Sequence, residues 1–404
     1  MKEGGAQLGA MRVGMFSECY EPVRNGVTTS VHTLVDQLRS LGHRVILVAP
    51  HYESHRDQSP FILRVPSIQT WLNKDYPISY PFFPRLRREF GQLQPDIVHS
   101  HNPFFVGLLA ARLAHMNDVP LVSTYHTLYN HYGHYVFFLP PAAIQGLLKW
   151  WIPDYYNRCA QVIVPSEVAR ISLLEYGVQS PITIIPTAVP LPDPTEINQE
   201  ARIAARAQWE IPADVPLLLY VGRIAQEKNI EMILDAFAVA GVRHPDARLL
   251  VVGGGPHCEA IHQHGEQLSV SSRIIFAGPM ARSELNPVYA AADIFVFGST
   301  TETQGLVMAE ARAAGTPSIV ARGGGAGETV TDGEDGILIE PTAEAMAAAM
   351  DALLDDRRRL GEMRAACLRN AHHYTPEAMV TKILDVYRAA LDVGNMQDRV
   401  ASAA

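Results

Sequence analysis

From residue 11 onward, short runs rich in Val, Ile and Leu alternate with longer stretches whose apolar residues recur at helical spacing. The run 11–17 (MRVGMFS) is followed by residues 26–41, in which Val31, Leu34 and Leu38 share one helical face before Gly42 ends the pattern. Such alternation is typical of βαβ units, in which helices connect parallel strands. The chain is therefore predicted to be an α/β protein with doubly wound parallel sheets.

The alternation occurs in two series, separated by a stretch rich in proline and charge. The predicted strands are 11–17, 45–49, 97–100, 121–124 and 161–165 in the first series, and 217–222, 248–253, 274–277, 294–297 and 318–321 in the second. A chain of 404 residues is also too long for one ordinary domain. We predict two Rossmann-like domains that face a central cleft, where open α/β sheets bind their ligands.

The domain boundaries follow from this division. We predict a flexible N-terminus over 1–10, a first Rossmann-like domain over 11–190, a linker region over 191–215, a second Rossmann-like domain over 216–375, a helix over 376–391 and a flexible tail over 392–404. The sequence leaves open on which domain the last helix packs.

Composition and charge indicate the cellular setting. No apolar run is long enough to span a membrane, and residues 1–10 lack a signal-peptide profile. The four cysteines are far apart, which argues against a disulfide framework. Residues 1–190 hold 15 Lys and Arg against 13 Asp and Glu, whereas the remainder holds 18 against 29. We expect a cytoplasmic protein that does not bind nucleic acid and whose mildly basic first half contacts the inner face of the plasma membrane.

Two cofactor hypotheses are disfavoured by the loops. No G-x-G-x-x-G follows the first strand, and Cys258 stands where Gly253-Gly254-Gly255 would need a further glycine. The chain also contains no D-x-D pair that could hold a divalent metal under a diphosphate. We therefore expect neither a nicotinamide cofactor nor a metal.

A pair of cations follows the first strand of the second series. Arg223 and Lys228 lie in GRIAQEKN, just past the carboxyl end of that strand. Arginine can grip phosphate oxygens bidentately, and lysine adds a point charge. The alternative is a pair of solvated surface cations, and the sequence alone does not choose between the two.

Residues 299–315 (STTETQGLVMAEARAAG) are predicted to form a polar loop followed by an apolar helix that begins near Gly305. The N-terminus of a helix offers unpaired N–H groups to a phosphate. Glu302 lies in the loop and Glu310 on the otherwise apolar helix, where an unpaired carboxylate is costly to bury. A hydroxyl-rich ligand would satisfy both carboxylates.

Together these motifs resemble the retaining glycosyltransferases of family 4, which have the two-domain GT-B fold. The resemblance extends from about Met11 to Leu391. Its most specific segments are FSECYEPVRNGVTTSV, STYHTLYNHYGHY, GRIAQEKNI and TTETQGLVMAEA with its E-x7-E pair. Within the family, these segments are most similar to bacterial enzymes that glucosylate diacylglycerol.

The resemblance implies that the domain over 11–190 binds the acceptor and the domain over 216–375 binds the nucleotide-sugar donor. It also implies roles for individual residues. It assigns Arg223 and Lys228 to the donor diphosphate, Glu310 to the donor ribose, Glu302 and His126 to the transferred sugar, Gly26 to close approach of the first loop, and Gln304, Gly305, Leu306 and Val307 to backbone contacts with phosphate and sugar. Two positions depart from many relatives. The first loop has Asn25-Gly26 instead of two glycines, and Thr303-Gln304-Gly305 replaces an aromatic residue and glycine.

The remaining conspicuous segments are rich in histidine or in aromatic residues. The pairs His99/His101 and His131/His134 have spacings that a metal could use, but solvated or hydrogen-bonded side chains are the favoured interpretation. Residues 135–156, with Trp150 and Trp151, fit a core helix or an interfacial helix. Residues 80–90 combine aromatics with Arg85, Arg87 and Arg88, as membrane-surface segments do.

The sequence thus predicts a retaining, metal-independent hexosyltransferase that moves glucose from UDP-glucose to a lipid hydroxyl such as that of diacylglycerol. It leaves open whether the reaction proceeds on one face of the sugar or by double displacement through a carboxylate. Three alternatives remain: another acceptor such as a sugar, polyol or mannosyl lipid, a nucleotide-sugar epimerase, and a non-catalytic nucleotide-sugar binding protein.

Overall fold

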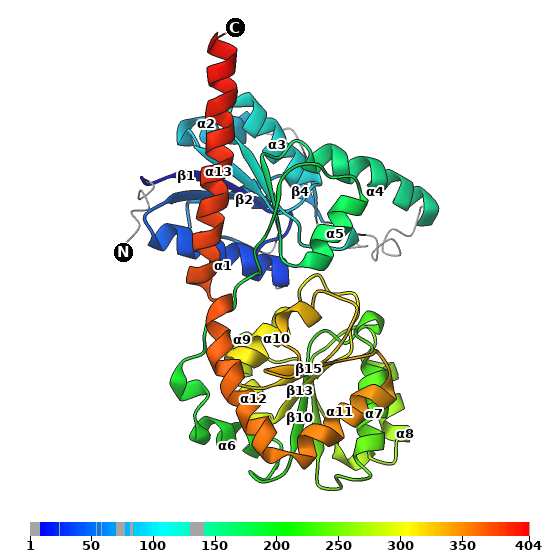
Figure 1. Ribbon diagram of the computed structural model, residues 1–404. Helices are drawn as coiled ribbons and strands as arrows, with labels where there is room; N and C mark the ends of the chain where they lie inside the picture. The colour runs from blue at the N-terminus through cyan, green and yellow to red at the C-terminus, as the bar shows by residue number, and fades with distance from the viewer. Residues whose placement is uncertain are drawn as a thin grey trace. The chain divides into compact units, whose positions relative to one another are not determined.

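The chain forms two compact units in the computed structural model (Figure 1). The first unit contains the chain up to Ala188 together with Pro376–Ala404, and the second contains Val189–Thr375. The structure describes residues 9–403 apart from 24, 54, 58, 70–76, 81–83 and 130–140. Most of the expected flexible N-terminus, and residues His131 and His134, therefore lie outside the described residues.

The first unit is built on a seven-stranded parallel sheet. Its strands lie in the order β3 (Ile62–Val65), β2 (Arg44–Pro50), β1 (Arg12–Phe16), β6 (Ile97–Ser100), β7 (Leu121–Thr124), β8 (Gln161–Val164) and β9 (Ile182–Ile184). A small antiparallel pair, β4 (Ser67–Ile68) and β5 (Ile78–Ser79), is separate from this sheet. The parallel sheet predicted from the sequence is confirmed, although the sequence did not predict β3 or β9.

Helices cover both faces of this sheet. They are α1 (Gly26–Ser40), α2 (Pro84–Leu93), α3 (Phe105–Met116), α4 (Pro141–Tyr156), α5 (Glu167–Glu175) and α13 (Pro376–Ala403). Helix α1 is capped by Asn25, whose side chain accepts a hydrogen bond from the Thr28 N–H. The helix ends before Gly42, which has a left-handed φ of 85°. Its apolar stripe is buried as predicted.

The two cores of the first unit lie on opposite faces of the sheet. Val13 and Met15 of β1 belong to the core that α1 and α13 close, whereas Phe16 belongs to the core beneath α2, α3, α4 and α5. Because successive side chains of a strand point to opposite faces, each buried strand contributes to both cores. Helix α13, red in Figure 1, therefore completes a core whose other members precede Val189.

The second unit contains a six-stranded parallel sheet. Its strands lie in the order β12 (Ile274–Gly278), β11 (Arg248–Val252), β10 (Leu217–Val221), β13 (Ile294–Phe297), β14 (Ser318–Ala321) and β15 (Gly336–Ile339). The helices are α6 (Gln199–Ala207), α7 (Ile230–Ala240), α8 (Cys258–Gln267), α9 (Arg282–Ala291), α10 (Leu306–Ala313), α11 (Ala343–Asp355) and α12 (Arg357–Asn370). Five of the strands match the predicted runs, and β15 was not predicted.

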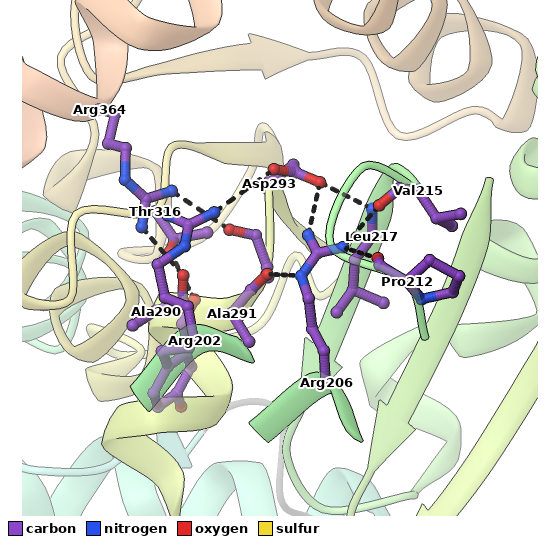
Figure 2. Close-up of polar contacts among 12 residues, drawn as sticks. Arg202, Arg206, Pro212, Val215, Leu217, Ala290, Ala291, Asp293, Thr316 and Arg364 are labelled. Atoms are coloured by element: carbon purple, nitrogen blue, oxygen red, sulfur yellow. Dashed lines mark hydrogen bonds and ion pairs between the residues drawn. The ribbon is translucent and has the colours of Figure 1, made fainter. Parts of the chain in front are cut away.

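Residues 191–215, which the sequence predicts as a linker region, are part of the second unit. Figure 2 shows how Arg206 of α6 attaches this segment to the sheet. Its guanidinium is almost fully buried and donates to four oxygens: Ala291 O at 2.9 Å, Pro212 O at 2.9 Å, Val215 O at 2.6 Å and Asp293 Oδ2 at 2.9 Å. Arg364 donates to Ala290 O at 2.9 Å, so two cations meet the negative C-terminal end of α9.

The last helix is longer than the sequence predicted. Helix α13 extends to Ala403, so the helix continues past residue 391, where the sequence predicted that it ends. Among the described residues, no helix is both long and apolar enough to cross a membrane.

Candidate active site

In the second unit, residues that follow neighbouring strands meet at one edge of the sheet. Strands β10 and β13 are paired in parallel, and Lys228 follows the first while Glu302 follows the second. The ammonium group of Lys228 forms an ion pair with the carboxylate of Glu302. Both side chains are largely buried, with 15% and 19% of their surface exposed. The structure therefore brings together two of the predicted site residues.

The loop after β10 is held in place by two close contacts with its backbone carbonyl groups. The buried Tyr220 hydroxyl donates to the Arg223 carbonyl at 3.0 Å, and a Cβ on Gly298 at the end of β13 would lie 2.8 Å from the Asn229 carbonyl. Glycine is needed at 298 because of this close approach. The Arg223 side chain is exposed and makes no ion pair with any residue that the structure describes. It is available to an anion at this edge.

Helix α10 begins next to Glu302. Gly305 has a left-handed φ of 78° at the start of the helix, a conformation that glycine adopts without strain. Gly305 is the capping residue and has no side chain to cap this end, and the first turn, which includes Leu306 and Val307, carries no acidic residue. Gln304 is buried immediately before it. The N-terminus of α10 therefore keeps the partial positive charge that favours an anion.

Glu310 lies one turn farther along α10 and has two partners on α9. Tyr289 donates its hydroxyl proton to Glu310 Oε2 at 2.8 Å, and Arg282 Nη2 lies 3.0 Å from Oε1. Burial raises the pKa of Glu310, and the charge of Arg282 opposes this shift. The sequence pointed to Glu310 but not to Arg282 or Tyr289, because nothing in the spacing of α9 residues shows which face meets α10.

In the first unit, Gly26 is the first residue of α1 and is exposed. Asn25 before it both caps α1 and donates to the sulfur of Cys19 at 3.2 Å. This loop has Asn25-Gly26 where many relatives have two glycines. As a result, α1 starts with a single glycine that follows a capping asparagine. The loop remains open at Gly26, where a ligand could approach the backbone.

Three imidazoles gather at the carboxyl ends of β6 and β7. His101 Nδ1 lies 2.9 Å from His126 Nε2, and the His99 ring stacks on that of His101 with centroids 4.4 Å apart. Burial is the main cause that lowers the pKa of His126 to about 4 and that of His99 to about 3, and it places the pKa of His101 well below its ordinary value. All three rings are therefore neutral near pH 7. His99 and His101 are hydrogen-bonded, as the favoured interpretation of the sequence has it.

A buried carboxyl group near this cluster was not predicted. Glu18 follows β1, and its Oε2 accepts the N–H of Val106 at 2.8 Å in the first turn of α3. Among the residues that the structure describes, its Oε1 has no hydrogen-bond partner, and burial raises the pKa of Glu18 to about 7. Only its place after the first strand could have drawn attention to it.

The two segments expected at a membrane surface differ in exposure. Arg87 and Arg88 of α2 are exposed, whereas the side chain of Arg85 lies outside the described residues. On α4, Trp150 is 61% exposed, while Trp151 packs against the core and donates its indole N–H to Pro103 O at 3.0 Å. Helix α4 is thus a core helix on one face and an apolar surface on the other.

Metal ligands are not clustered in the part of the chain that the structure describes. No group of three or more His, Cys, Asp or Glu side chains there is arranged to hold a metal ion. The polar groups of the candidate site are instead arginine, lysine, two glutamates and a helix N-terminus.

Comparison with known proteins identifies the family. Residues 24–192 match the model of Glycosyltransferase Family 4, and residues 201–374 match that of Glycosyl transferases group 1. The chain is 33% identical over 350 residues to alpha-monoglucosyldiacylglycerol synthase of Streptococcus pneumoniae, covering 85% of this chain and 78% of that protein. It is 28% identical over 386 residues to a GDP-mannose-dependent alpha-mannosyltransferase of Corynebacterium glutamicum, covering 93% and 88%.

Solved structures agree on the fold. The crystal structure of HepE from Anabaena in complex with UDP superimposes with a TM-score of 0.74 at 17% identity, covering 94% of this chain and 100% of that one. WaaG, a glycosyltransferase involved in lipopolysaccharide biosynthesis, gives 0.67 at 17% identity, covering 93% and 99%. With two parallel-sheet units, two matching family models and a relative above 30% identity, the chain belongs to family 4 of the glycosyltransferases, a family of retaining enzymes with the GT-B fold.

Proposed function

We propose that this glycosyltransferase transfers glucose from UDP-glucose to a hydroxyl of diacylglycerol, with retention of the α configuration and without a metal ion. The observation that carries the proposal is the group formed by Lys228, Glu302, Glu310 and the uncapped start of α10, with Arg223 exposed beside it. Identity of 33% to a monoglucosyldiacylglycerol synthase supports the choice of donor and acceptor.

The donor diphosphate would take the place of Glu302 as the partner of Lys228. A diphosphate carries more negative charge than one carboxylate, and Arg223 and the N-terminus of α10 would share its binding. Glu302 would then be free to accept hydrogen bonds from the hydroxyls of the glucose. Glu310 would accept hydrogen bonds from the ribose, because Tyr289 and Arg282 hold its two carboxylate oxygens in place.

The same cations would assist the chemistry. As the glucose–phosphate bond breaks, negative charge grows on the leaving diphosphate and positive charge grows on the sugar. Arg223, Lys228 and the helix N-terminus would stabilise the former without a metal. The oxygen of the acceptor hydroxyl would bond to the anomeric carbon on the face from which the diphosphate departs, and its proton would pass to the leaving phosphate oxygen. Attack on that face gives retention.

The acceptor is a membrane lipid, so the protein must dock at a bilayer. We propose that Arg87 and Arg88 of α2 and the exposed Trp150 of α4 provide this contact. An exposed tryptophan suits the interfacial layer, and each cation near an anionic surface contributes about 1 kcal/mol. Replacing both arginines by glutamine should reduce binding to anionic vesicles roughly thirtyfold at low salt. Val242→Ala, which removes an apolar side chain 77% exposed on the second unit, is the matched control and should bind normally.

The decisive assay offers the purified chain UDP-glucose and anionic vesicles that contain diacylglycerol, without added metal, and detects glycolipid by mass spectrometry. Glu302→Gln should lower the rate at least about a hundredfold. Glu340→Gln, at a side chain 75% exposed, should leave the rate unchanged.

Other outcomes select other functions. Release of UDP without glycolipid would discard the lipid acceptor, and a free altered nucleotide sugar would indicate an epimerase. Turnover of GDP-mannose alone would favour the mannosyltransferase alternative, which the Corynebacterium glutamicum relative supports across 93% of the chain. No turnover with any donor would leave a nucleotide-sugar binding protein.

A further inference from the structure

The hydrogen bonds around His101 restrict where the protons of two histidines can be. His101 is almost fully buried after β6, and both of its ring nitrogens have partners. Its Nε2 lies 2.9 Å from the sulfur of Met15 on β1, and its Nδ1 lies 2.9 Å from His126 Nε2. No carboxylate forms an ion pair with either ring among the residues that the structure describes. Nothing in this environment therefore favours a charged imidazole.

Met15 decides the tautomer of His101. A thioether sulfur can accept a hydrogen bond but has no proton to donate. Two lone pairs 2.9 Å apart would repel, so the His101 Nε2 carries the proton and donates it to the sulfur. A neutral imidazole has only one N–H, which leaves the His101 Nδ1 as an acceptor.

The acceptor at His101 Nδ1 determines which nitrogen of His126 carries the proton. Its Nε2, opposite the lone pair of His101 Nδ1, has to carry a proton for a hydrogen bond to form. Because His126 is also neutral near pH 7, its Nδ1 is unprotonated. That Nδ1 makes no hydrogen bond with any residue that the structure describes, and the side chain is partly exposed.

We propose that His101 is a positioning residue that fixes His126 as the Nε2–H tautomer, so that the Nδ1 of His126 accepts a hydrogen bond from a hydroxyl of the transferred sugar. The sugar contact rests on the proposed function, whereas the tautomer rests on the contacts of Met15, His101 and His126 alone. The sugar hydroxyl is then the donor. His126 has no proton to give to the sugar or to the leaving group.

His99 explains how the ring of His101 is held in place. Its imidazole stacks on that of His101, and its two nitrogens are bound by the hydroxyls of Tyr387 at 2.7 Å and Thr124 at 2.8 Å. Hydroxyls can donate or accept, so these partners fit either tautomer of His99. They fix the plane of the stacked pair and leave the choice of tautomer to Met15.

The first test reads the tautomer directly in the full-length protein. Two-bond and three-bond proton–nitrogen correlations in a sample labelled with ¹⁵N-histidine distinguish a protonated ring nitrogen from an unprotonated one, and His126→Gln assigns the signals. We expect a protonated Nε2 and an unprotonated Nδ1 for His126 near pH 7. A protonated Nδ1 would overturn the proposal.

The second test asks whether His101 imposes this tautomer. His101→Phe keeps a ring against His99 but removes the acceptor, so the ratio of the two His126 tautomers should fall roughly tenfold. His101→Asn places an oxygen near the former Nδ1 and should restore the ratio. An unchanged ratio in a folded His101→Phe variant would refute the positioning role. If His101→Phe does not fold, Met15→Leu tests the same chain of contacts, and its His126 ratio should also fall.

The third test concerns the sugar. Donor analogues in which one glucose hydroxyl is replaced by hydrogen or by fluorine are compared, since fluorine cannot donate a hydrogen bond. At the hydroxyl that contacts His126, both replacements should lower kcat/KM of the wild-type enzyme equally, about tenfold. In His126→Ala, the donor with that hydroxyl replaced should have the same kcat/KM as UDP-glucose. A fluorine that restores the rate would show that His126 donates, which contradicts the proposal. Loss of all turnover would refute the proposed function, while the tautomer measurements would still test the remainder.

Discussion

At the scale of single residues, Glu310 is notable because both of its carboxylate oxygens are engaged by side chains of one helix, α9. Tyr289 fixes one oxygen and Arg282 neutralises the other. This arrangement gives the carboxylate a single orientation, and the charge of Arg282 opposes the rise in its pKa that burial causes. A ribose diol would then meet a preformed acceptor pair.

Tyr289→Phe should therefore weaken binding of UDP. The ring still fills its buried site, but one hydrogen bond to a charged group is lost, which corresponds to about a tenfold loss of affinity. Calorimetric titration with UDP and with 2′,3′-dideoxy-UDP checks the cause, because the dideoxy nucleotide should bind both proteins equally. Tyr80→Phe, at a tyrosine 48% exposed, is the control. An equal loss for both nucleotides would contradict a role in holding the ribose.

Glu18 makes the stability of the protein depend on pH. Its pKa is raised to about 7 by burial, so the folded state binds a proton that the unfolded state has already lost between pH 4.5 and 7. Stability contributed by the neutral carboxyl is therefore lost as the pH rises through this window. The difference in pKa corresponds to about 3 kcal/mol.

Glu18→Gln should remove this part of the pH dependence. Urea unfolding at pH 5 and pH 8 should show wild type losing more stability with rising pH than the variant does. Glu53→Gln, at an exposed residue of the same unit, should behave like wild type. Parallel pH profiles for wild type and Glu18→Gln would show that the carboxyl is not protonated in the folded protein.

Sequence reasoning found residues of the site only where local pattern carries information. Glu302, Gly305 and Lys228 lie beside strand ends or helix starts, and both kinds of position can be read from periodicity. The partners of those residues are set by packing between elements distant in sequence. Tyr289 and Met15 look like ordinary core residues until α10 and β6 are placed against them.

At the scale of elements, the segment before β10 depends on Arg206. The sequence predicted a linker region over residues 191–215, because this stretch is rich in proline and charge. A guanidinium that binds Asp293 and three carbonyl oxygens instead makes α6 part of the second unit (Figure 2). No periodicity of α6 could show this, because the partners lie in loops and at the end of α9.

Arg206→Met should destabilise the second unit by about 3 kcal/mol, since it leaves carbonyl groups and Asp293 without their buried donor. Thermal unfolding of the full chain measures the loss. Arg243→Met, which removes an arginine 58% exposed with two surface ion pairs, should change the melting temperature little. Similar shifts for the two variants would mean that the buried network adds nothing to stability.

The elements that the sequence did not predict are short strands at sheet edges. Strands β3, β9 and β15 have four residues or fewer, and each is an edge strand of its sheet. Such strands have only one paired neighbour and are less buried than the central strands, so burial imposes a weaker apolar pattern on them. The pairing that defines them comes from the neighbouring strand.

At the scale of the whole molecule, the first unit is discontinuous in sequence. Its core between the sheet and α1 includes Ile383, Val386 and Tyr387 of α13, and Tyr387 also binds the buried His99. The sequence predicted a helix here but could not assign it to a domain, because an apolar stripe does not reveal which core it fills. The second unit, in contrast, is a continuous segment with one core.

Separate expression of the two units should reveal this difference. Residues 189–375 should fold alone with a cooperative thermal transition measured by circular dichroism. Residues 9–188 should fold only when fused to 376–391, because the fragment alone exposes the apolar face that α13 covers. A cooperative transition in the unfused fragment would show that α13 is dispensable. A peptide of scrambled α13 sequence, fused in the same way, is the control.

Helix α13 also sets an order of events during synthesis. The ribosome makes the sheet of the first unit early, but the face that α1 and α13 share remains only partly covered until the entire second unit has been translated. The second unit can reach its final structure while the first still awaits its last helix. A nascent chain stalled before residue 376 would therefore carry a finished second unit together with a first unit that still exposes an apolar surface to chaperones.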